Sequence, residues 1–186
     1  MTVVLHTSIS LDGYVAGPDV SHDDPMGVGG ERLHDWMFAD PAESDQRLMA
    51  EVRAEVGAVV VGRRTFDLGL PHWKDVPFPA PSFVVTHRAR PELAQPSGTF
   101  AFVDGVAKAV ELAEAAAGEQ KVMLMGADVA RQSLRAGLVD EVLLDHVPML
   151  LRGGERLFED VPELELRPVD VVASPAVTHV RYRMVR

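Results

Sequence analysis

Ala58-Val-Val-Val-Gly-Arg-Arg-Thr-Phe66 is the stretch on which the predicted fold of this chain depends. Its β-branched run, Val59 to Val61, is typical of a strand buried on both faces. The strand ends at Gly62, and two arginines and a threonine follow at its carboxyl end. In open α/β sheets ligands bind at that edge, and guanidinium groups beside free backbone N–H groups suit a phosphate. The alternative interpretation is that both arginines are surface cations at the end of an ordinary strand.

Strands and helices alternate along the sequence up to Val139, and strands alone follow. Apolar strands are expected at residues 3–7, 59–61, 82–86, 99–103 and 121–125, and helices at 41–57, 104–117 and 127–136. Residues 99–103 are expected to form an edge strand, and the proline-rich stretch after Phe66 a loop. Gly57 is expected to end the first helix and Asp104 to cap the second.

The last part of the chain has a different character. Residues 143–147, 164–172 and 177–185 read as consecutive strands, which indicates an antiparallel portion. The sequence therefore predicts a single α/β domain over residues 1–186. Its sheet is expected to be mixed and mainly parallel, flanked by helices, with an antiparallel C-terminal edge.

The composition argues against several classes of function. The chain has 186 residues and a formal net charge of −10, so broad nucleic-acid binding is not expected. It contains no cysteine, which excludes disulfides, thiol catalysis and thiolate metal sites. His22-Asp23-Asp24 has metal-ligand chemistry, but no further ligand falls at a regular spacing, so no metal is expected. No signal peptide or membrane-length apolar run is apparent, and a cytoplasmic location without membrane association is expected.

Three of the predicted strands end in groups that suit phosphates. These ends are Gly62-Arg63-Arg64-Thr65, Thr86-His87-Arg88 and Gly126-Ala127-Asp128. In a parallel sheet such carboxyl ends share one edge, and a helix that begins after a glycine adds a positive N-terminus. Together they suggest a dinucleotide across the edge, with its pyrophosphate near the third segment. The three arginines and the histidine would surround an additional phosphate, which favours NADPH over NADH.

The chain resembles the dihydrofolate reductase superfamily, in particular the reductase domain of riboflavin-biosynthesis enzymes, the RibD C-terminal-like branch. The matching segments occur in the family's order: residues 10–17, 59–66, 84–88, 123–130, 136–142 and 148–154. The resemblance implies NADPH as hydride donor and reduction of a pterin-like or pyrimidine-like substrate. The expected activity resembles that of 5-amino-6-(5-phosphoribosylamino)uracil reductase or dihydrofolate reductase. A deaminase half would need zinc-binding cysteines, so a stand-alone reductase is expected.

The resemblance also implies roles for particular residues. The adenosine ribose phosphate would be held by Gly62, Arg63, Arg64, Thr65, Thr86, His87 and Arg88. The pyrophosphate and nicotinamide side would be held by Gly126, Ala127, Asp128 and Val129. The carboxylate that binds the pterin in dihydrofolate reductases would fall near Asp45 or Gln46. The sequence around it does not match the folate-binding pattern, and a first-turn helix acid is the alternative interpretation.

Candidates for the chemistry lie near the amino terminus. Asp12 follows the first strand and is a candidate catalytic residue, although Asp12-Gly13 is also a common turn pair. Ser10 is expected on the floor of the substrate site or bonded to backbone groups. Trp36 is expected to stack on a planar heterocycle or to pack in the core. Water remains an alternative proton donor.

Rival classes of function predict different behaviour. A non-catalytic NADP(H)-binding or sensory protein would bind the cofactor without turnover. A phosphoryl-transfer enzyme would need a Walker-type run or paired aspartates, and neither is found. A structural domain would bind no nucleotide. The apolar strands near the carboxyl terminus would leave an exposed edge or face on a monomer, so a homodimer is expected.

Overall fold

The structure is a computed structural model that describes residues 1–39 and 41–185. The chain divides into two compact units, of which unit 1 holds residues 1–5 and 55–140 and unit 2 holds residues 6–54 and 141–186. This division does not test the expected single domain, which stays a prediction. The fold class is mixed α/β with a mostly parallel sheet and an antiparallel edge, as the sequence predicted.

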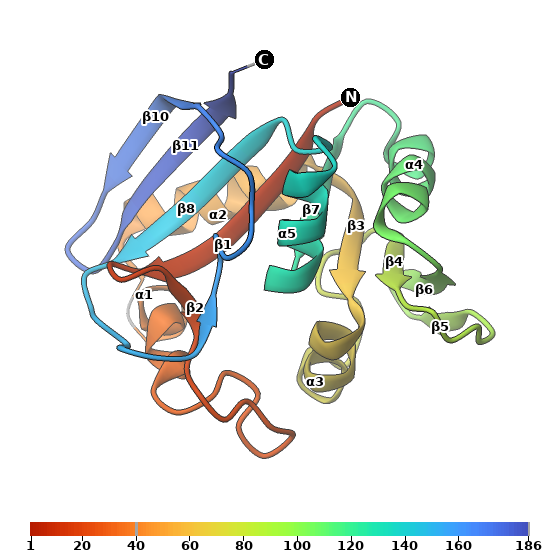
Figure 1. The fold of residues 1–186 in the computed structure, drawn as a ribbon, viewed down its shortest axis with the longest axis horizontal. Helices are drawn as coiled ribbons and strands as arrows, with labels where there is room; N and C mark the ends of the chain where they lie inside the picture. Colours follow the sequence, from red (N-terminus) through yellow and green to blue (C-terminus); the bar gives the residue numbers. More distant parts are fainter. Residues whose placement is uncertain (40, 186) are drawn as a thin grey trace. The chain divides into compact units, whose positions relative to one another are not determined.

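Unit 1 is built on a mainly parallel set of neighbouring strands (Figure 1). Only the first residues of β1 (Val3–Ser10) belong to unit 1. The strand order is β1, β7 (Lys121–Met125), β3 (Val56–Gly62), β4 (Ser82–Val85), β6 (Gly98–Val103) and β5 (Leu93–Gln95). All neighbouring pairs are parallel except β5 with β6. Every residue of β3 is buried, which explains its unbroken apolar sequence. The predicted edge position of residues 99–103 is wrong, because β5 pairs outside β6.

Helices α4 (Val106–Ala117) and α5 (Ala127–Arg135) pack against β3 and β7. The sequence predicted that Gly57 ends the preceding helix. This prediction is wrong, because Gly57 lies inside β3. A Cβ at this position would lie 2.6 Å from the carbonyl oxygen of Ala117, so the glycine lets the end of α4 approach the strand. Asp104 does not cap α4. The N-cap is Gly105, and no side chain bonds the first turn there.

Helix α3 (Arg63–Trp73) continues directly from β3 (Figure 1). The loop expected after Phe66 is therefore wrong as far as Trp73, whereas residues 74–81 have neither helix nor strand, as expected. Phe66 and Trp73 are seven residues apart on one helix face and both rings pack against Phe100, with centroids 4.9 and 6.3 Å away. Pro71 lies inside the helix near its end. The aromatic contacts stabilise a helix that the local proline content argued against.

Unit 2 contains the antiparallel strands predicted from the end of the chain. Strands β10 (Leu166–Ala173), β11 (Thr178–Met184) and β8 (Glu141–Val147) pair in this order, all antiparallel. A two-stranded ribbon joins β2 (Tyr14–Ala16) and β9 (Glu155–Arg156). The helices are the 3₁₀ helix η1 (Gly30–His34), α1 (Asp35–Phe38) and α2 (Glu43–Glu55). No helix in residues 1–39 or 41–185 is long and apolar enough to cross a membrane.

The core of unit 2 positions one aromatic side chain that matters for the site. Trp36 is buried with Leu33, Val147 and Val177. Its indole N–H donates to Ser8 Oγ at 3.1 Å, so the buried polar atom is paired. The core interpretation of Trp36 therefore holds, and the same ring also borders a pocket described below.

Candidate active site

The carboxyl ends of three strands in unit 1 meet at one edge, as the sequence predicted. Val61 of β3 is opposite Met125 of β7, and Gly62 is opposite Val85 of β4. Helices α3 and α5 begin one residue after Gly62 and Gly126. Two positive helix N-termini therefore lie at neighbouring strand ends, which is a suitable arrangement for an anion.

Thr65 and Gly126 are in direct contact at this edge. Gly126 has φ +98°, a backbone conformation that L side chains rarely adopt, and a Cβ there would collide with Thr65 Oγ1. A Cβ at Gly62 would be in ordinary van der Waals contact with both Thr65 and Val129. The side chain of Val129 is buried. The structure thus brings together these four of the predicted cofactor-binding residues.

The predicted cationic cluster is partly neutralised by its own neighbours. Arg63 donates its Nε to both carboxylate oxygens of Asp67, at 2.9 and 2.8 Å. His87 Nδ1 lies 2.6 Å from Asp104 Oδ1, and both side chains are exposed. Asp67 and Asp104, which the sequence interpretation did not weigh as partners, therefore bond these two side chains.

The remaining cofactor candidates lie in turns and at the helix start. Arg88 is exposed, and its backbone N–H donates to Thr86 Oγ1 at 3.1 Å. Asp128 is exposed in the first turn of α5 and accepts a 2.7 Å hydrogen bond from Gln132. Ala127 is the first residue of the same helix. Thr86 and Asp128 therefore have local structural bonds in addition to any role toward a ligand.

Asp12 lies in unit 2 and anchors a turn. Ser10 Oγ donates to Asp12 Oδ1 at 2.6 Å, and the backbone N–H groups of Leu151 and Arg152 donate to its two carboxylate oxygens at 3.1 and 2.7 Å. The hydrogen bond from Ser10, together with those from the two backbone amides, lowers the pKa of Asp12 to about 2. At neutral pH this group has no proton to donate, so the geometry supports the turn interpretation. Ser10 Oγ also accepts from the backbone N–H of Tyr14, which was the alternative stated for it.

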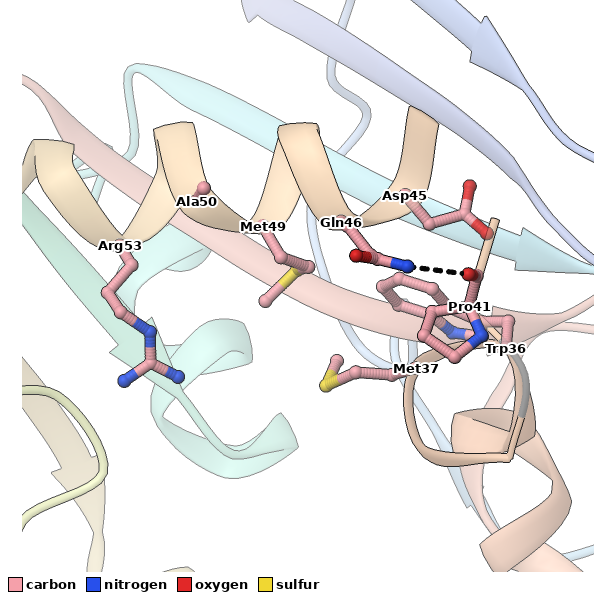
Figure 2. Close-up of a pocket in the computed structure, with 8 residues that line it drawn as sticks. All are labelled: Trp36, Met37, Pro41, Asp45, Gln46, Met49, Ala50 and Arg53. Atoms are coloured by element: carbon pink, nitrogen blue, oxygen red, sulfur yellow. Dashed lines mark hydrogen bonds between the residues drawn. The ribbon is translucent and has the colours of Figure 1, made fainter. Parts of the chain in front are cut away.

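A pocket of about 320 Å³ lies along one side of α2 in unit 2, and its size suits a small planar molecule (Figure 2). Trp36 and Asp45 both border it, so the structure brings together these two predicted substrate-binding residues. The rest of its lining is Met37, Pro41, Gln46, Met49, Ala50 and Arg53. A neighbouring pocket shares Trp36, Pro41 and Asp45 and extends toward Ser174.

Asp45 is buried to 1% exposure and makes bonds through both oxygens. Oδ2 accepts from the backbone N–H of Ala42 at 3.3 Å, which is the first-turn role that the sequence indicated, and from Ser174 Oγ at 3.1 Å. Oδ1 lies 3.2 Å from His179 Nε2. The carboxylate is therefore both a helix-capping group and part of the pocket wall.

Sequence reasoning missed the histidines behind this carboxylate. His179 Nδ1 lies 2.7 Å from Asp145 Oδ1, and Asp145 Oδ2 lies 2.8 Å from His6 Nε2. His6 and Asp145 interrupt two apolar strand sequences, β1 and β8, which was an available signal. No group of three or more potential metal ligands among the residues described is arranged to hold an ion.

The mostly parallel sheet with its antiparallel edge is that of a dihydrofolate-reductase-like fold. The family model of the RibD C-terminal domain matches residues 1–180. The chain therefore belongs to the RibD C-terminal domain family. No curated protein matches the sequence.

Solved structures support the fold at low sequence identity. One, from Shewanella sp. PV-4 and assigned provisionally to riboflavin biosynthesis, is 23% identical with a TM-score of 0.75 and full coverage of both chains. A pyrimidine reductase-like protein from Corynebacterium diphtheriae is 16% identical with a TM-score of 0.67, covering 100% of this chain and 92% of the other. The Thermotoga maritima diaminohydroxyphosphoribosylaminopyrimidine deaminase/5-amino-6-(5-phosphoribosylamino)uracil reductase is 17% identical with a TM-score of 0.66. That match covers 99% of this chain but 56% of the bifunctional protein.

Proposed function

We propose that the protein is an NADPH-dependent reductase of a small nitrogen heterocycle, resembling 5-amino-6-(5-phosphoribosylamino)uracil reductase or dihydrofolate reductase. The observation that carries the proposal is the meeting of three strand ends, at Gly62, Val85 and Met125, on one edge. Two helix N-termini at this edge provide backbone N–H groups for phosphates. Membership of the RibD C-terminal domain family supports reductase chemistry.

The residues at this edge fit a dinucleotide with an additional phosphate. Gly105 is the N-cap of α4 with φ +87°, and a Cβ there would meet no atom within 4 Å, so there is open space at this end of the helix. Arg64, Thr65 and Arg88 would bind the phosphate, and residues 126–129 the pyrophosphate. The cofactor would supply the hydride. Asp67 bonds Arg63 and Asp104 bonds His87, so these two side chains would share or exchange those bonds when they bind the phosphate.

The pocket along α2 is the substrate site in this proposal. Asp45 lies in the first turn of the helix and Arg53 eight residues later, about 12 Å along the axis at 1.5 Å per residue. Both residues line the pocket, and Figure 2 shows them at opposite ends of the stretch of α2 that borders it. This arrangement suits a heterocycle whose N–H groups donate to Asp45 and whose anionic substituent approaches Arg53. A phosphoribosyl-pyrimidine has both features, and a neutral pterin has one.

The cofactor assignment is tested by measuring dissociation constants for NADPH and NADH. Charge-assisted bonds to a phosphate contribute about 1.5–3 kcal/mol, so Arg64→Ala and Arg88→Ala are each expected to weaken NADPH binding by about 10- to 100-fold. Arg63→Ala is expected to weaken NADPH binding in the same direction, and Arg47→Ala, which removes an exposed arginine of α2, is expected to have no effect. NADH binding should stay unchanged in all four variants. Equal losses for both cofactors, or no NADPH preference in the wild type, would refute the assignment.

Turnover separates the proposal from a non-catalytic NADP(H)-binding protein. One observation favours that second candidate: Asp12, the predicted catalytic residue, is bonded to Ser10 and two backbone amides. The test is to screen pterins, flavins and phosphoribosyl-pyrimidines for loss of the reduced-nicotinamide absorbance. Tight NADPH binding with no oxidation for any heterocycle would favour the non-catalytic protein. The cytoplasmic location and homodimer expected from the sequence remain part of the proposal.

A further inference from the structure

A buried chain of alternating carboxylates and imidazoles forms part of the pocket wall. It runs from Asp45 to His179, Asp145 and His6 through contacts of 3.2, 2.7 and 2.8 Å. The four side chains come from α2, β11, β8 and β1, and none is more than 8% exposed. Four titratable groups are rarely buried together unless their charges are paired.

The geometry around His179 demands a proton on each ring nitrogen or on a neighbouring acid. Both Nδ1 and Nε2 face carboxylate oxygens. A neutral imidazole has a single N–H, so it would leave one nitrogen lone pair against a carboxylate oxygen. An imidazolium donates to both Asp145 and Asp45. The other satisfied arrangement has the proton on Asp45, and the two differ by moving one proton across the 3.2 Å contact.

The groups packed around His179 favour the imidazolium. Burial lowers the pKa of His179, but the hydrogen bonds and charges of Asp145 and Asp45 outweigh it and raise the pKa above 6.5. Burial also raises the pKa of Asp145, and the charges and hydrogen bonds of His6 and His179 reverse this to a lowered value. The Trp36 ring packs edge-to-face with the imidazole, with the two ring centroids 4.8 Å apart, and adds no charge.

The other histidines nearby do not compete for this proton. His34 of η1 is half-buried, and desolvation lowers its pKa despite the opposing charge of Asp145. His146 of β8 follows Asp145, and burial lowers its pKa as well. On the acid side, Ser174 Oγ and the N–H of Ala42 donate to the second oxygen of Asp45. His179 is therefore the cation that the two carboxylates share, with His6 behind it.

We propose that His179 is a positioning residue that holds one proton for the pocket, donating it through Nε2 to Asp45, while Asp145 and His6 fix the ring. This inference rests on the proposed function. When a C=N bond is reduced, the carbon takes a hydride from the reduced nicotinamide and the nitrogen takes a proton. The His179 Nε2–H bond breaks as Asp45 gains the proton, and Asp45 passes it to the substrate nitrogen. The neutral ring keeps its Nδ1–H bond to Asp145 until solvent returns a proton.

The first test needs neither substrate nor cofactor. Long-range proton–nitrogen NMR on the ¹⁵N-labelled wild type reports which ring nitrogens carry protons. We expect both His179 nitrogens to be protonated at pH 7, and His179 to deprotonate at a higher pH than His146. His179→Gln assigns the signals by their disappearance. A bare nitrogen on His179 at pH 7 would overturn the inference.

The second test uses the pH dependence of turnover with the best heterocycle found. In His179→Gln the amide nitrogen retains a donor for Asp45 but has no proton to transfer. We expect kcat to fall about 10- to 100-fold while KM stays within about threefold. The wild-type rate should fall as pH rises through the pKa of His179, and the variant should lack this fall. His146→Gln, one residue from Asp145, should keep the wild-type profile.

The results separate this inference from the proposed function. An unaltered pH profile in a folded His179→Gln would overturn the proton role while the reductase activity stood. If no heterocycle is reduced, the proposed function fails, and the NMR titration still decides whether His179 holds the proton. If His179→Gln does not fold, His6→Gln replaces it, and a smaller loss of kcat in the same direction is expected.

Discussion

Replacing Gly126 by alanine tests the strand-end site through one atom. Gly126 (φ +98°, ψ 138°) and Gly105 (φ +87°, ψ 139°) are both N-caps of helices in unit 1, and their backbone conformations nearly coincide. An added Cβ at Gly126 would come closer to Thr65 Oγ1 than the 3.0 Å that real Cβ atoms observe, and at Gly105 it would meet nothing within 4 Å. Gly105→Ala is therefore a matched control that has the backbone strain without the collision.

The expected magnitudes follow from this difference. The unfavourable backbone conformation costs each variant about 1–3 kcal/mol of unfolding free energy. The contact with Thr65 adds about 1–3 kcal/mol to Gly126→Ala alone, the usual cost of forcing an atom into a packed site. Thr65→Ala removes the colliding oxygen, so the double variant should recover most of that additional cost. The coupling energy of the double-mutant cycle measures the contact directly.

Urea denaturation at a fixed pH gives the unfolding free energies of the wild type and the four variants, and NADPH titration of the same five proteins gives the dissociation constants. Gly126→Ala should be the less stable of the two single glycine variants and should bind NADPH more weakly, because displacing Thr65 shifts the start of α3. Equal destabilisation of the two glycine variants would show that the contact has no energetic weight. An unchanged NADPH affinity in Gly126→Ala would remove this turn from the proposed cofactor site.

Three further predictions concern unit 2. Because the pKa of His179 is raised in the folded state, its protonation stabilises the fold by about 1.4 kcal/mol per pKa unit; this stabilisation is complete below pH about 6.5 and is lost as pH rises through the folded-state pKa. The difference in unfolding free energy between the wild type and His179→Gln should therefore decrease above pH 6.5, and a difference that does not change with pH would contradict this prediction. Asp12→Asn should destabilise the turn that holds Leu151 and Arg152, because one acceptor oxygen is lost, and should raise hydrogen exchange at these two amides; a loss of turnover with unchanged exchange would instead restore the catalytic interpretation. A homodimer is expected because β10 exposes Val169 and Val171 on an eight-residue strand, and a monomeric mass at micromolar concentration would exclude it.

The sequence predicted the parallel strands well because each is a short apolar run bounded by glycine or polar residues. β3 is the clearest case, since all seven of its residues are buried and no alternation complicates the pattern. The shared edge of Gly62, Val85 and Met125 followed from topology alone, because parallel strands place their carboxyl ends together. Prediction succeeded where the information is local or follows from strand direction.

Tertiary contacts caused the errors. Helix α3 was missed because the prolines after Phe66 indicated a loop, and the packing of Trp73 on Phe100 is invisible to a local pattern. The ion pairs of Arg63 with Asp67 and of His87 with Asp104 were missed for two reasons. The Arg63–Asp67 pair has i,i+4 spacing within a helix that was not predicted, and the His87–Asp104 pair joins residues that are 17 positions apart in the sequence.

The sequence presented Asp45 as a choice between a helix-capping acid and a substrate-binding acid, and the structure removes the need to choose. Oδ2 receives the backbone N–H of Ala42 and so stabilises the start of α2, while Oδ1 is directed to His179. Because the cap fixes the carboxylate, it is held at the pocket wall without any substrate. A first-turn acid commonly accepts the backbone N–H at the start of its own helix. What distinguishes Asp45 is the buried imidazole behind it, contributed by a strand more than 130 residues away, which no local pattern predicts.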